Sequence, residues 1–379
     1  MAIQIDGCCS PGSVVNRGGK NDPQALFGAA TCSTISLRAA KPQVRFSRTT
    51  IKIVAMVVLL LPPAALAGTT PMRGVMSPTQ FNASDLEVLG QYQANLIRWQ
   101  IMRNWGRSNT ERDLDDYNSW LARKLNELDQ VLAAAEANGL KVAIDLHTPP
   151  GGRYADKSMA MFYEQVYNDR FIQIWQEIAT RYKGNPAVWA YDLVNEPTQN
   201  STTPSTGMDS KSTQIKAAQA IRVIDPTTPI IIQPHGILHY GTSADSYKGF
   251  TPVTGISNIW YEVHLYNFLP ELVNGTSCYP GQAGGLNWNK NLLRAIMHSA
   301  WAFQSKYQVK MYVGEFSFPV GSCGAKQFLS DYIDLFEEYG WDWTYHAFRE
   351  APMWNMEAPD RKDLLLGWFA KNTSRTVRQ

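Results

Sequence analysis

From residue 70 onward, two kinds of hydrophobic pattern alternate along the chain. Short runs rich in Val, Ile, Tyr and Trp are typical of buried strands, whereas longer segments with an apolar residue every three or four positions are typical of amphipathic helices. The strand-like runs cover residues 72–77, 96–102, 141–147, 188–196, 229–234, 258–266, 309–316 and 341–348. The clearest helix-like segments cover residues 114–139, 169–184, 212–224, 289–307, 326–340 and 361–371.

This alternation predicts an α/β fold. Strands that alternate with helices form parallel sheets, and eight such units suggest a closed (β/α)8 barrel. The structural alternative is an open doubly wound sheet, which more often carries a glycine-rich phosphate loop after its first strand. The sequence has no such loop after residues 72–77. We therefore expect residues 68–379 to form a single TIM-barrel domain.

The first 67 residues have a different pattern and are not expected to belong to the barrel. Residues 45–67 begin with basic side chains, continue with the apolar run from Ile53 to Leu61, and end in small residues at Ala65-Leu66-Ala67. This order is that of a bacterial-type signal peptide, so we expect a secreted protein. Residues 1–44 show no periodicity and are expected to be an unstructured extension, which a wrongly chosen start would explain.

A membrane anchor is the alternative interpretation of the same segment. The apolar run is shorter than the roughly 20 residues that a spanning helix needs, and Pro62 and Pro63 end it, so we expect no stable anchor. Removal of residues 1–67, which carry seven basic and two acidic side chains, changes the net charge from +2 to −3. The basic balance of the whole chain is thus no argument for binding nucleic acid, and no nucleic-acid partner is expected.

Polar side chains gather where the predicted strands end. Chemistry in a (β/α)8 barrel takes place at the carboxyl ends of the strands, which meet on one face. The amino ends here are mostly apolar or small. The candidate site residues on strands two, three, four, six and seven are Arg98, His147, Asn195, Glu196, His264, Tyr266 and Glu315.

Glu196 and Glu315 end strands four and seven, which face each other across a small barrel. Two carboxyl groups that flank one bond, one protonated and one ionised, are what glycoside hydrolysis requires. The protonated group gives its proton to the leaving oxygen, and the ionised group attacks the sugar carbon. A structural ion pair is the alternative role for either glutamate alone. Arg98 would favour the ionised state of a neighbouring carboxyl group.

The strand ends together resemble a known family. "LVNEP" at residues 193–197, "HLY" at 264–266 and "GEF" at 314–316 look like the corresponding motifs of glycoside hydrolase family 5, the cellulase family of clan A. The resemblance covers residues 70–370. Asn-Glu-Pro alone occurs by chance, but the ordered set of motifs, each at the end of the matching strand, is specific.

The resemblance implies a retaining mechanism and a role for each matching residue. Glu196 would be the acid/base and Glu315 the nucleophile. Asn195 would bind the sugar 2-hydroxyl, and Arg98 and Tyr266 would hold Glu315. His147 and His264 would line the subsite of the sugar that is attacked, the −1 subsite.

Aromatic residues are expected to stack on sugar rings in the cleft. The family usually places a Trp at the end of strand eight, but this chain has "WDWTYHAFRE" there, so the position falls on Trp343, His346 or Phe348. We assign Trp343 to substrate binding, together with Trp105 after strand two and Trp354 in the loop beyond strand eight.

The expected function is that of a secreted, monomeric, retaining endo-β-1,4-glucanase whose partner is a β-glycan polysaccharide or oligosaccharide. An endo-β-1,4-mannanase or other β-glycanase is the first alternative, since loops decide between these sugars. An inactive carbohydrate-binding protein is an alternative of another class, but such proteins usually lose a catalytic carboxyl group. No cofactor or metal is expected, because the first strand lacks the His-x-His pair that metal-dependent barrel hydrolases often have.

Cys278 and Cys323 are the cysteines that remain after residues 1–67 are removed. They lie in the loops that follow strands six and seven, and neighbouring strands place these loops side by side. Two thiols in an exported protein tend to pair, so we expect a Cys278–Cys323 disulfide, with two free thiols as the alternative.

Overall fold

The computed structural model describes residues 70–78, 80–103, 111–199, 207–235, 243–266 and 269–372. The predicted extension (residues 1–44), the predicted signal peptide (residues 45–67) and Trp105 lie outside the described residues. Within the described ranges, none of the helices is both long and apolar enough to cross a membrane.

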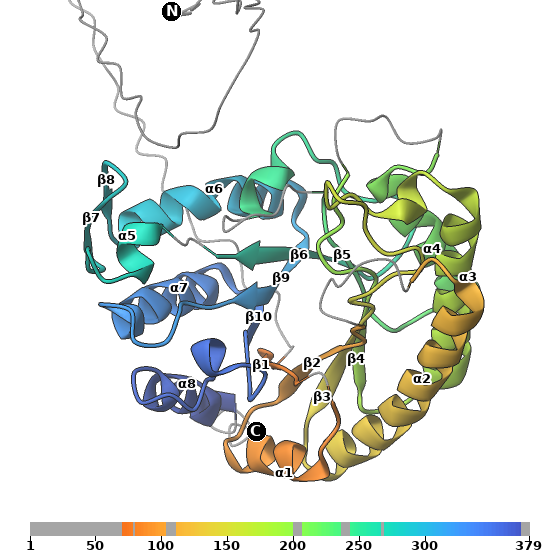
Figure 1. Cartoon of the computed structure of the whole chain (residues 1–379), viewed down its shortest axis with the longest axis horizontal. Helices are drawn as coiled ribbons and strands as arrows, with labels where there is room; N and C mark the ends of the chain where they lie inside the picture. Colours follow the sequence, from red (N-terminus) through yellow and green to blue (C-terminus); the bar gives the residue numbers. More distant parts are fainter. Residues whose placement is uncertain are drawn as a thin grey trace, which may run out of the picture. The chain divides into compact units, whose positions relative to one another are not determined.

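Eight strands of the described part close into a parallel barrel, which confirms the predicted (β/α)8 fold (Figure 1). Their order around the barrel is β1-β10-β9-β6-β5-β4-β3-β2, and each strand is parallel to both of its neighbours. Their bounds are β1 Arg73–Met76, β2 Leu96–Gln100, β3 Lys141–Asp145, β4 Val188–Asp192, β5 Ile230–Ile232, β6 Ile259–Leu265, β9 Lys310–Phe316 and β10 Asp342–Tyr345.

Helices surround the strands on the outside of the barrel (Figure 1). Several of them begin where a side chain accepts hydrogen bonds from free backbone N–H groups, as Asp113 does before α2 and Asn289 before α6. The α-helices are α1 Ala83–Gln91, α2 Leu114–Ala137, α3 Gln165–Tyr182, α4 Ser210–Ile224, α5 Pro270–Val273, α6 Lys290–Tyr307, α7 Ala325–Tyr339 and α8 Lys362–Phe369. A small hairpin, β7 Gly281–Ala283 and β8 Leu286–Trp288, lies between α5 and α6, and the sequence pattern did not indicate it.

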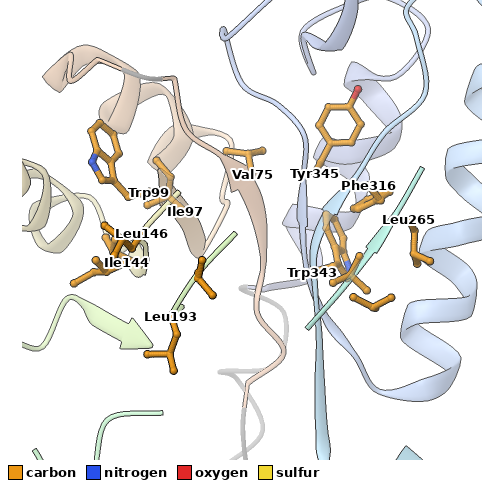
Figure 2. Close-up of a cluster of buried hydrophobic side chains, with 14 of the residues drawn as sticks. Val75, Ile97, Trp99, Ile144, Leu146, Leu193, Leu265, Phe316, Trp343 and Tyr345 are labelled. Atoms are coloured by element: carbon orange, nitrogen blue, oxygen red, sulfur yellow. The ribbon is translucent and has the colours of Figure 1, made fainter. Parts of the chain in front are cut away.

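The barrel has two apolar layers, because successive strand residues point to opposite faces. Figure 2 shows the outer layer, in which side chains such as Trp99, Ile144, Phe316 and Trp343 belong to the main hydrophobic cluster. A second, smaller cluster has members on alternating strand positions and fills the inside of the barrel: Met72, Leu96, Ala143, Ala190, Ile231, Trp260 and Tyr312. Charged side chains occupy the inward positions nearer the carboxyl ends of the strands.

A bulge in β9 brings Glu315 to the inside of the barrel. The register between β6 and β9 shifts after Val263, so that Glu315 pairs with His264 although Tyr312 pairs with Glu262. Gly314 occupies the bulge, and a Cβ atom there would lie 1.5 Å from Oε1 of Glu262. Only glycine therefore allows the buried Glu262 carboxyl group to lie directly beside the strand that carries Glu315.

The expected disulfide is confirmed, because Cys278 and Cys323 are bonded with their Cα atoms 4.7 Å apart. The backbone N–H of Tyr279 also donates to the carbonyl of Cys323 at 3.1 Å. The bond joins the segment between α5 and β7 to the loop between β9 and α7. The disulfide therefore restrains the loop that follows β9, the strand that carries Glu315.

Removal of this disulfide should lower stability. We expect Cys278→Ser/Cys323→Ser to lose roughly 3–4 kcal/mol of unfolding free energy, because the bond closes a loop with a sequence separation of 45 residues. Urea unfolding of the variant and of the wild-type protein, each with and without reductant, measures the effect. Reductant should destabilise the wild type alone, and equal stability of all four samples would contradict the prediction.

Candidate active site

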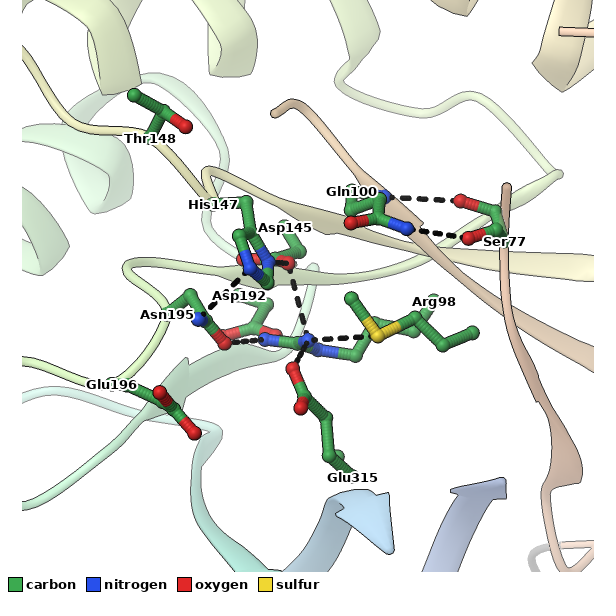
Figure 3. A network of polar contacts seen from close by, with 12 residues as sticks. Ser77, Arg98, Gln100, Asp145, His147, Thr148, Asp192, Asn195, Glu196 and Glu315 are labelled. Atoms are coloured by element: carbon green, nitrogen blue, oxygen red, sulfur yellow. Dashed lines mark hydrogen bonds and ion pairs between the residues drawn. The ribbon is translucent and has the colours of Figure 1, made fainter. Parts of the chain in front are cut away.

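Arg98 on β2 is the centre of the polar cluster inside the barrel, and its side chain is fully buried. Its guanidinium group donates from Nε to Asp192 at 2.7 Å, from Nη1 to Glu315 at 2.7 Å, and from Nη2 to Asn195 at 3.1 Å (Figure 3). Asp145 and Glu262 lie within ion-pair distance of it, at 3.2 and 3.3 Å. A single buried cation thus faces four carboxyl groups.

The four carboxyl groups around Arg98 do not share one charge state. Burial raises the pKa of Asp192 well above its usual range, despite the attraction of Arg98. Burial would also raise the pKa of Glu262, but Arg98, His264 and a hydrogen bond with Asp192 outweigh burial and lower it. Asp192 therefore holds a proton more readily than Glu262 does, and a proton on Asp192 reduces the negative charge in a site with little water.

Glu315 is held as an ionised group. Burial would raise its pKa, but the positive charges of His264 and Arg98 outweigh burial and lower the pKa well below the usual range. Its two oxygens are each bound by a donor, Oε1 by Arg98 and Oε2 by the hydroxyl of Tyr266 at 2.7 Å. Burial and the charge of Glu315 raise the pKa of Tyr266, so this hydroxyl remains a donor. Such a carboxylate is oriented and negatively charged, as a nucleophile must be.

Glu196 lies beyond the end of β4 rather than within it. The predicted strand reached residue 196, but β4 ends at Asp192 and the chain then leaves the sheet. Glu196 has a φ of 49°, in the left-handed region. Its Oε1 lies 3.0 Å from Nδ1 of His264, and its side chain is 23% exposed, against 7% for Glu315. The more exposed carboxyl group is the one that can exchange protons with a leaving group and with water.

His264 joins the two glutamates. Its Nδ1 is 3.0 Å from Glu196 and 3.8 Å from Glu315, and its Nε2 is 3.2 Å from Glu262. Burial would lower the pKa of His264, but the charges of Glu315 and Glu262 raise it well above the usual value. The imidazole is therefore a charged donor that fixes the distance between the carboxyl groups.

His147 and Asn195 form a second hydrogen-bonded chain at the mouth of the barrel (Figure 3). The Asn195 side-chain oxygen accepts from Arg98, so its Nδ2 group donates to Nε2 of His147 at 3.0 Å. Nε2 of His147 must then be the acceptor, and its Nδ1–H donates to Asp145 at 2.7 Å. The chain fixes the orientation of the Asn195 amide, which is needed if that amide binds a sugar hydroxyl.

The carboxyl groups of Glu196 and Glu315 are close enough to act on one bond. One oxygen of each lies within 4.8 Å of the other and of a ring nitrogen of His264. These three atoms are the one group among the described residues whose spacing would suit a metal ion. A metal would need His264 to lose its proton, and the raised pKa of His264 opposes that loss. The arrangement fits proton transfer and nucleophilic attack better than metal binding.

The structure corrects the expectation for Trp343. Its side chain is fully buried on the helix side of β10, where it packs on Phe316 and Phe369 and donates to Glu337. Strand alternation explains the difference, because the hydroxyl of its neighbour Thr344 contacts Tyr312 inside the barrel. Trp343 is therefore not available to a sugar.

His346 takes the inward position at the end of β10 instead. Its ring lies 5.8 Å from Tyr266 and 5.7 Å from Trp354 between centroids, and its Nε2 pairs with Glu350 at 3.0 Å. The half-buried Trp354 thus borders the site, and its role in binding a sugar stays a prediction. Burial would lower the pKa of His346, but the hydrogen bond to Glu350 raises it. The wall beside Glu315 therefore contains an imidazole, which takes up a proton more readily than usual, at the position where the resemblance led us to expect an indole.

The sequence did not lead us to two of the residues that contact Glu196. Gln233 follows β5, and its side-chain oxygen accepts from the backbone N–H of Glu196 at 2.6 Å. Arg153 follows β3, and its Nη2 donates to the carbonyls of Asn195 and Glu196, each at 3.0 Å. The position of Gln233 at a strand end was a usable signal, whereas no sequence pattern marks Arg153.

Comparison with known proteins identifies the family and relatives of this chain. The sequence model of the cellulase family, glycosyl hydrolase family 5, matches residues 67–351. Endoglucanase C of Acetivibrio thermocellus is 28% identical over 268 residues, which cover 61% of this chain and 75% of that protein. An endoglucanase of Paenibacillus polymyxa is 26% identical, over 59% of this chain and 57% of its own length.

Solved structures give the same fold. A structure described as a glycoside hydrolase has a TM-score of 0.62 at 19% identity, and the match covers 80% of this chain and 99% of that one. An endoglucanase of Pseudomonas stutzeri has a TM-score of 0.59 at 19% identity, with 82% and 96% covered.

Proposed function

The chain belongs to the cellulase family, glycosyl hydrolase family 5, and from that membership we propose that it is a secreted, retaining endo-β-1,4-glucanase. The observation that carries the retaining mechanism is the separation of the two catalytic carboxyl groups. Oxygens of Glu196 and Glu315 lie within 4.8 Å of each other. Retaining enzymes have carboxyl groups about 5–5.5 Å apart, whereas inverting enzymes need about 6.5–9.5 Å to admit a water molecule.

In the first step, Glu196 gives its proton to the glycosidic oxygen while Glu315 attacks the anomeric carbon. The bond to the leaving sugar breaks as a covalent glycosyl–Glu315 ester forms. The low pKa of Glu315 keeps it ionised for this attack. Arg98 and Tyr266, which each bind one of its oxygens, hold the carboxylate in a fixed orientation. Asn195, held by Arg98 and His147, is the proposed partner of the sugar 2-hydroxyl.

In the second step, Glu196 takes a proton from a water molecule, which attacks the anomeric carbon and releases Glu315. His264 contacts Glu196 and lies near Glu315, so it is placed to orient both carboxyl groups. His147, His264, His346, Tyr266 and Trp354 would line the part of the cleft that holds the attacked sugar. Trp105 is kept as a further candidate for sugar stacking.

A parallel assay of four polysaccharides tests which β-glycan the enzyme hydrolyses. We expect reducing-sugar release from carboxymethylcellulose and mixed-linkage glucan to exceed release from galactomannan and laminarin. Faster release from galactomannan would show that the preferred substrate is β-mannan, the first alternative, and would leave the proposed mechanism unchanged. An absence of release from all four would contradict an active glycanase and favour a carbohydrate-binding protein.

A further inference from the structure

Asn195 and Glu196 are neighbours in the chain, and both place their side chains at the mouth of the barrel. Successive residues of an extended strand point to opposite faces, so two neighbours cannot both face the barrel mouth while the backbone stays extended. Here Asn195 contacts Arg98 and His147, and Glu196 contacts His264. The left-handed φ of 49° at Glu196 is where the backbone departs from the extended form.

A left-handed backbone is disfavoured for a residue that has a Cβ atom. Glycine would relieve this strain but would remove the carboxyl group. The surrounding structure therefore has to hold Glu196 in place, as is common where backbone strain lies at a functional site.

Gln233 and Arg153 bind the backbone of Glu196 from two sides. The buried Gln233 side chain accepts from the Glu196 N–H at 2.6 Å, and Arg153 donates to the carbonyls of Asn195 and Glu196. These contacts satisfy the peptide groups on both sides of the strained residue. Neither side chain is a partner of Glu315, so their contacts with the catalytic pair are made through Glu196.

Both residues are themselves held in place. Gln214 on α4 exchanges two hydrogen bonds with the backbone of Gln233, at 2.9 and 3.1 Å. Arg153 lies in the loop after β3, where it pairs with Met159 in an isolated β-bridge and also donates to Thr198 at 3.2 Å. The support therefore extends from the loop after β3 to helix α4.

We propose that Gln233 and Arg153 are positioning residues for Glu196, which they hold in the conformation that aims its carboxyl group at the glycosidic oxygen. The inference rests on the proposed role of Glu196 as acid/base. It deepens that role, because it makes proton donation depend on two side chains that contact the backbone of Glu196 and are not partners of Glu315.

The dependence of rate on the leaving group tests this role. Phenyl β-cellobioside needs a proton from the enzyme to leave, whereas 2,4-dinitrophenyl β-cellobioside does not. Gln233→Leu should lower kcat/KM roughly 10-fold or more on the phenyl substrate, the scale of a lost hydrogen bond that leaves a buried donor unpaired. It should change the rate on the dinitrophenyl substrate by less than about 3-fold. Gln233→Glu keeps the acceptor and should restore most of the phenyl rate.

Asn168→Leu is the matched control. Asn168 is a buried amide on α3 that bonds Met161 and Thr213, away from the mouth. Its loss should lower stability and leave the ratio of the two rates unchanged. Arg153→Met is the second variant and should likewise lose more rate on the phenyl substrate than on the dinitrophenyl substrate. If Gln233→Leu does not fold, Arg153→Met alone tests the positioning role. Equal losses on both substrates in these variants would overturn the inference.

Glu196→Ala separates this inference from the proposed function. A selective loss on the phenyl substrate in Glu196→Ala, but not in Gln233→Leu or Arg153→Met, would refute only the positioning role. Equal loss on both substrates in Glu196→Ala itself would refute the acid/base assignment, and the positioning role with it. A wild-type enzyme that cleaves neither substrate would contradict both.

Discussion

Glu315→Ala should lower kcat on the order of 10⁵-fold, the scale seen when an enzyme loses its covalent nucleophile. The site binds this carboxylate with a donor on each oxygen and holds its pKa low, and no other described carboxylate lies against both Tyr266 and Arg98. The rate should be measured on 2,4-dinitrophenyl β-cellobioside, for which proton donation is not limiting.

Added azide should partly restore turnover of Glu315→Ala, because a small anion can occupy the space of the lost carboxylate. The product should be the α-glycosyl azide, since attack comes from the face that Glu315 used. Glu196→Ala is the matched control, and with azide it should give the β-adduct. A β-azide from Glu315→Ala would contradict the assignment of the nucleophile.

Arg98→Met should be the most destabilising single change in the barrel interior. It removes the cation and leaves Asp145, Asp192, Glu262 and Glu315 buried together, and removal of one partner from a buried ion pair typically costs about 3–5 kcal/mol. Urea unfolding at pH 7 should show a loss of at least this size. Activity should also fall, because the positive charge of Arg98 is one of those that keep Glu315 ionised.

The loss of stability in Arg98→Met should shrink as the pH is lowered. Without Arg98, the buried carboxyl groups have higher pKa values than in the unfolded chain, so the folded variant gains stability by taking up protons as the pH falls. The wild type behaves oppositely at Glu315, whose lowered pKa contributes stability at neutral pH that is lost in acid. Unfolding free energies measured from pH 8 to pH 4 give the slope of the variant, and measurements continued below pH 4 give that of the wild type, because Glu315 takes up its proton only below the pKa of an unfolded glutamate.

Arg73→Met is the matched control for that experiment. Arg73 is also a buried arginine, but it pairs with Glu337, whose side chain is 20% exposed and can be hydrated. Its loss should cost less and should depend less on pH. A deficit in Arg98→Met that is constant from pH 8 to pH 4, or equal to that of Arg73→Met, would contradict the role given to Arg98.

The sequence was sufficient for the barrel and for the residues at the strand ends. Strand and helix periods differ enough to count the units, and a parallel barrel brings all carboxyl ends to one face. That rule alone placed Arg98, His264, Tyr266 and Glu315 in one site, and the structure brings them together. The disulfide followed from the same topology, because β6 and β9 are neighbours.

The direction of individual side chains was harder to predict. At Trp343, the assignment depended on which alternate positions of β10 face inward. Trp341, Trp343 and Tyr345 share one face of this strand and Asp342, Thr344 and His346 the other, and it is the polar set that faces the inside of the barrel. At Glu196, the strand was extended too far, since the sequence does not reveal that the chain turns with a positive φ. Arg153 supports Glu196 through backbone carbonyls, and such contacts leave no residue pattern at the position they support.

The configuration of the first product tests the central claim most directly. Proton NMR of a cello-oligosaccharide digest can follow the newly formed reducing end before its anomers equilibrate. Two displacements at the same carbon, first by Glu315 and then by water, predict that the β-anomer appears first and the α-anomer only later. Initial formation of the α-anomer would mean a single displacement by water and would contradict the roles assigned to Glu196 and Glu315.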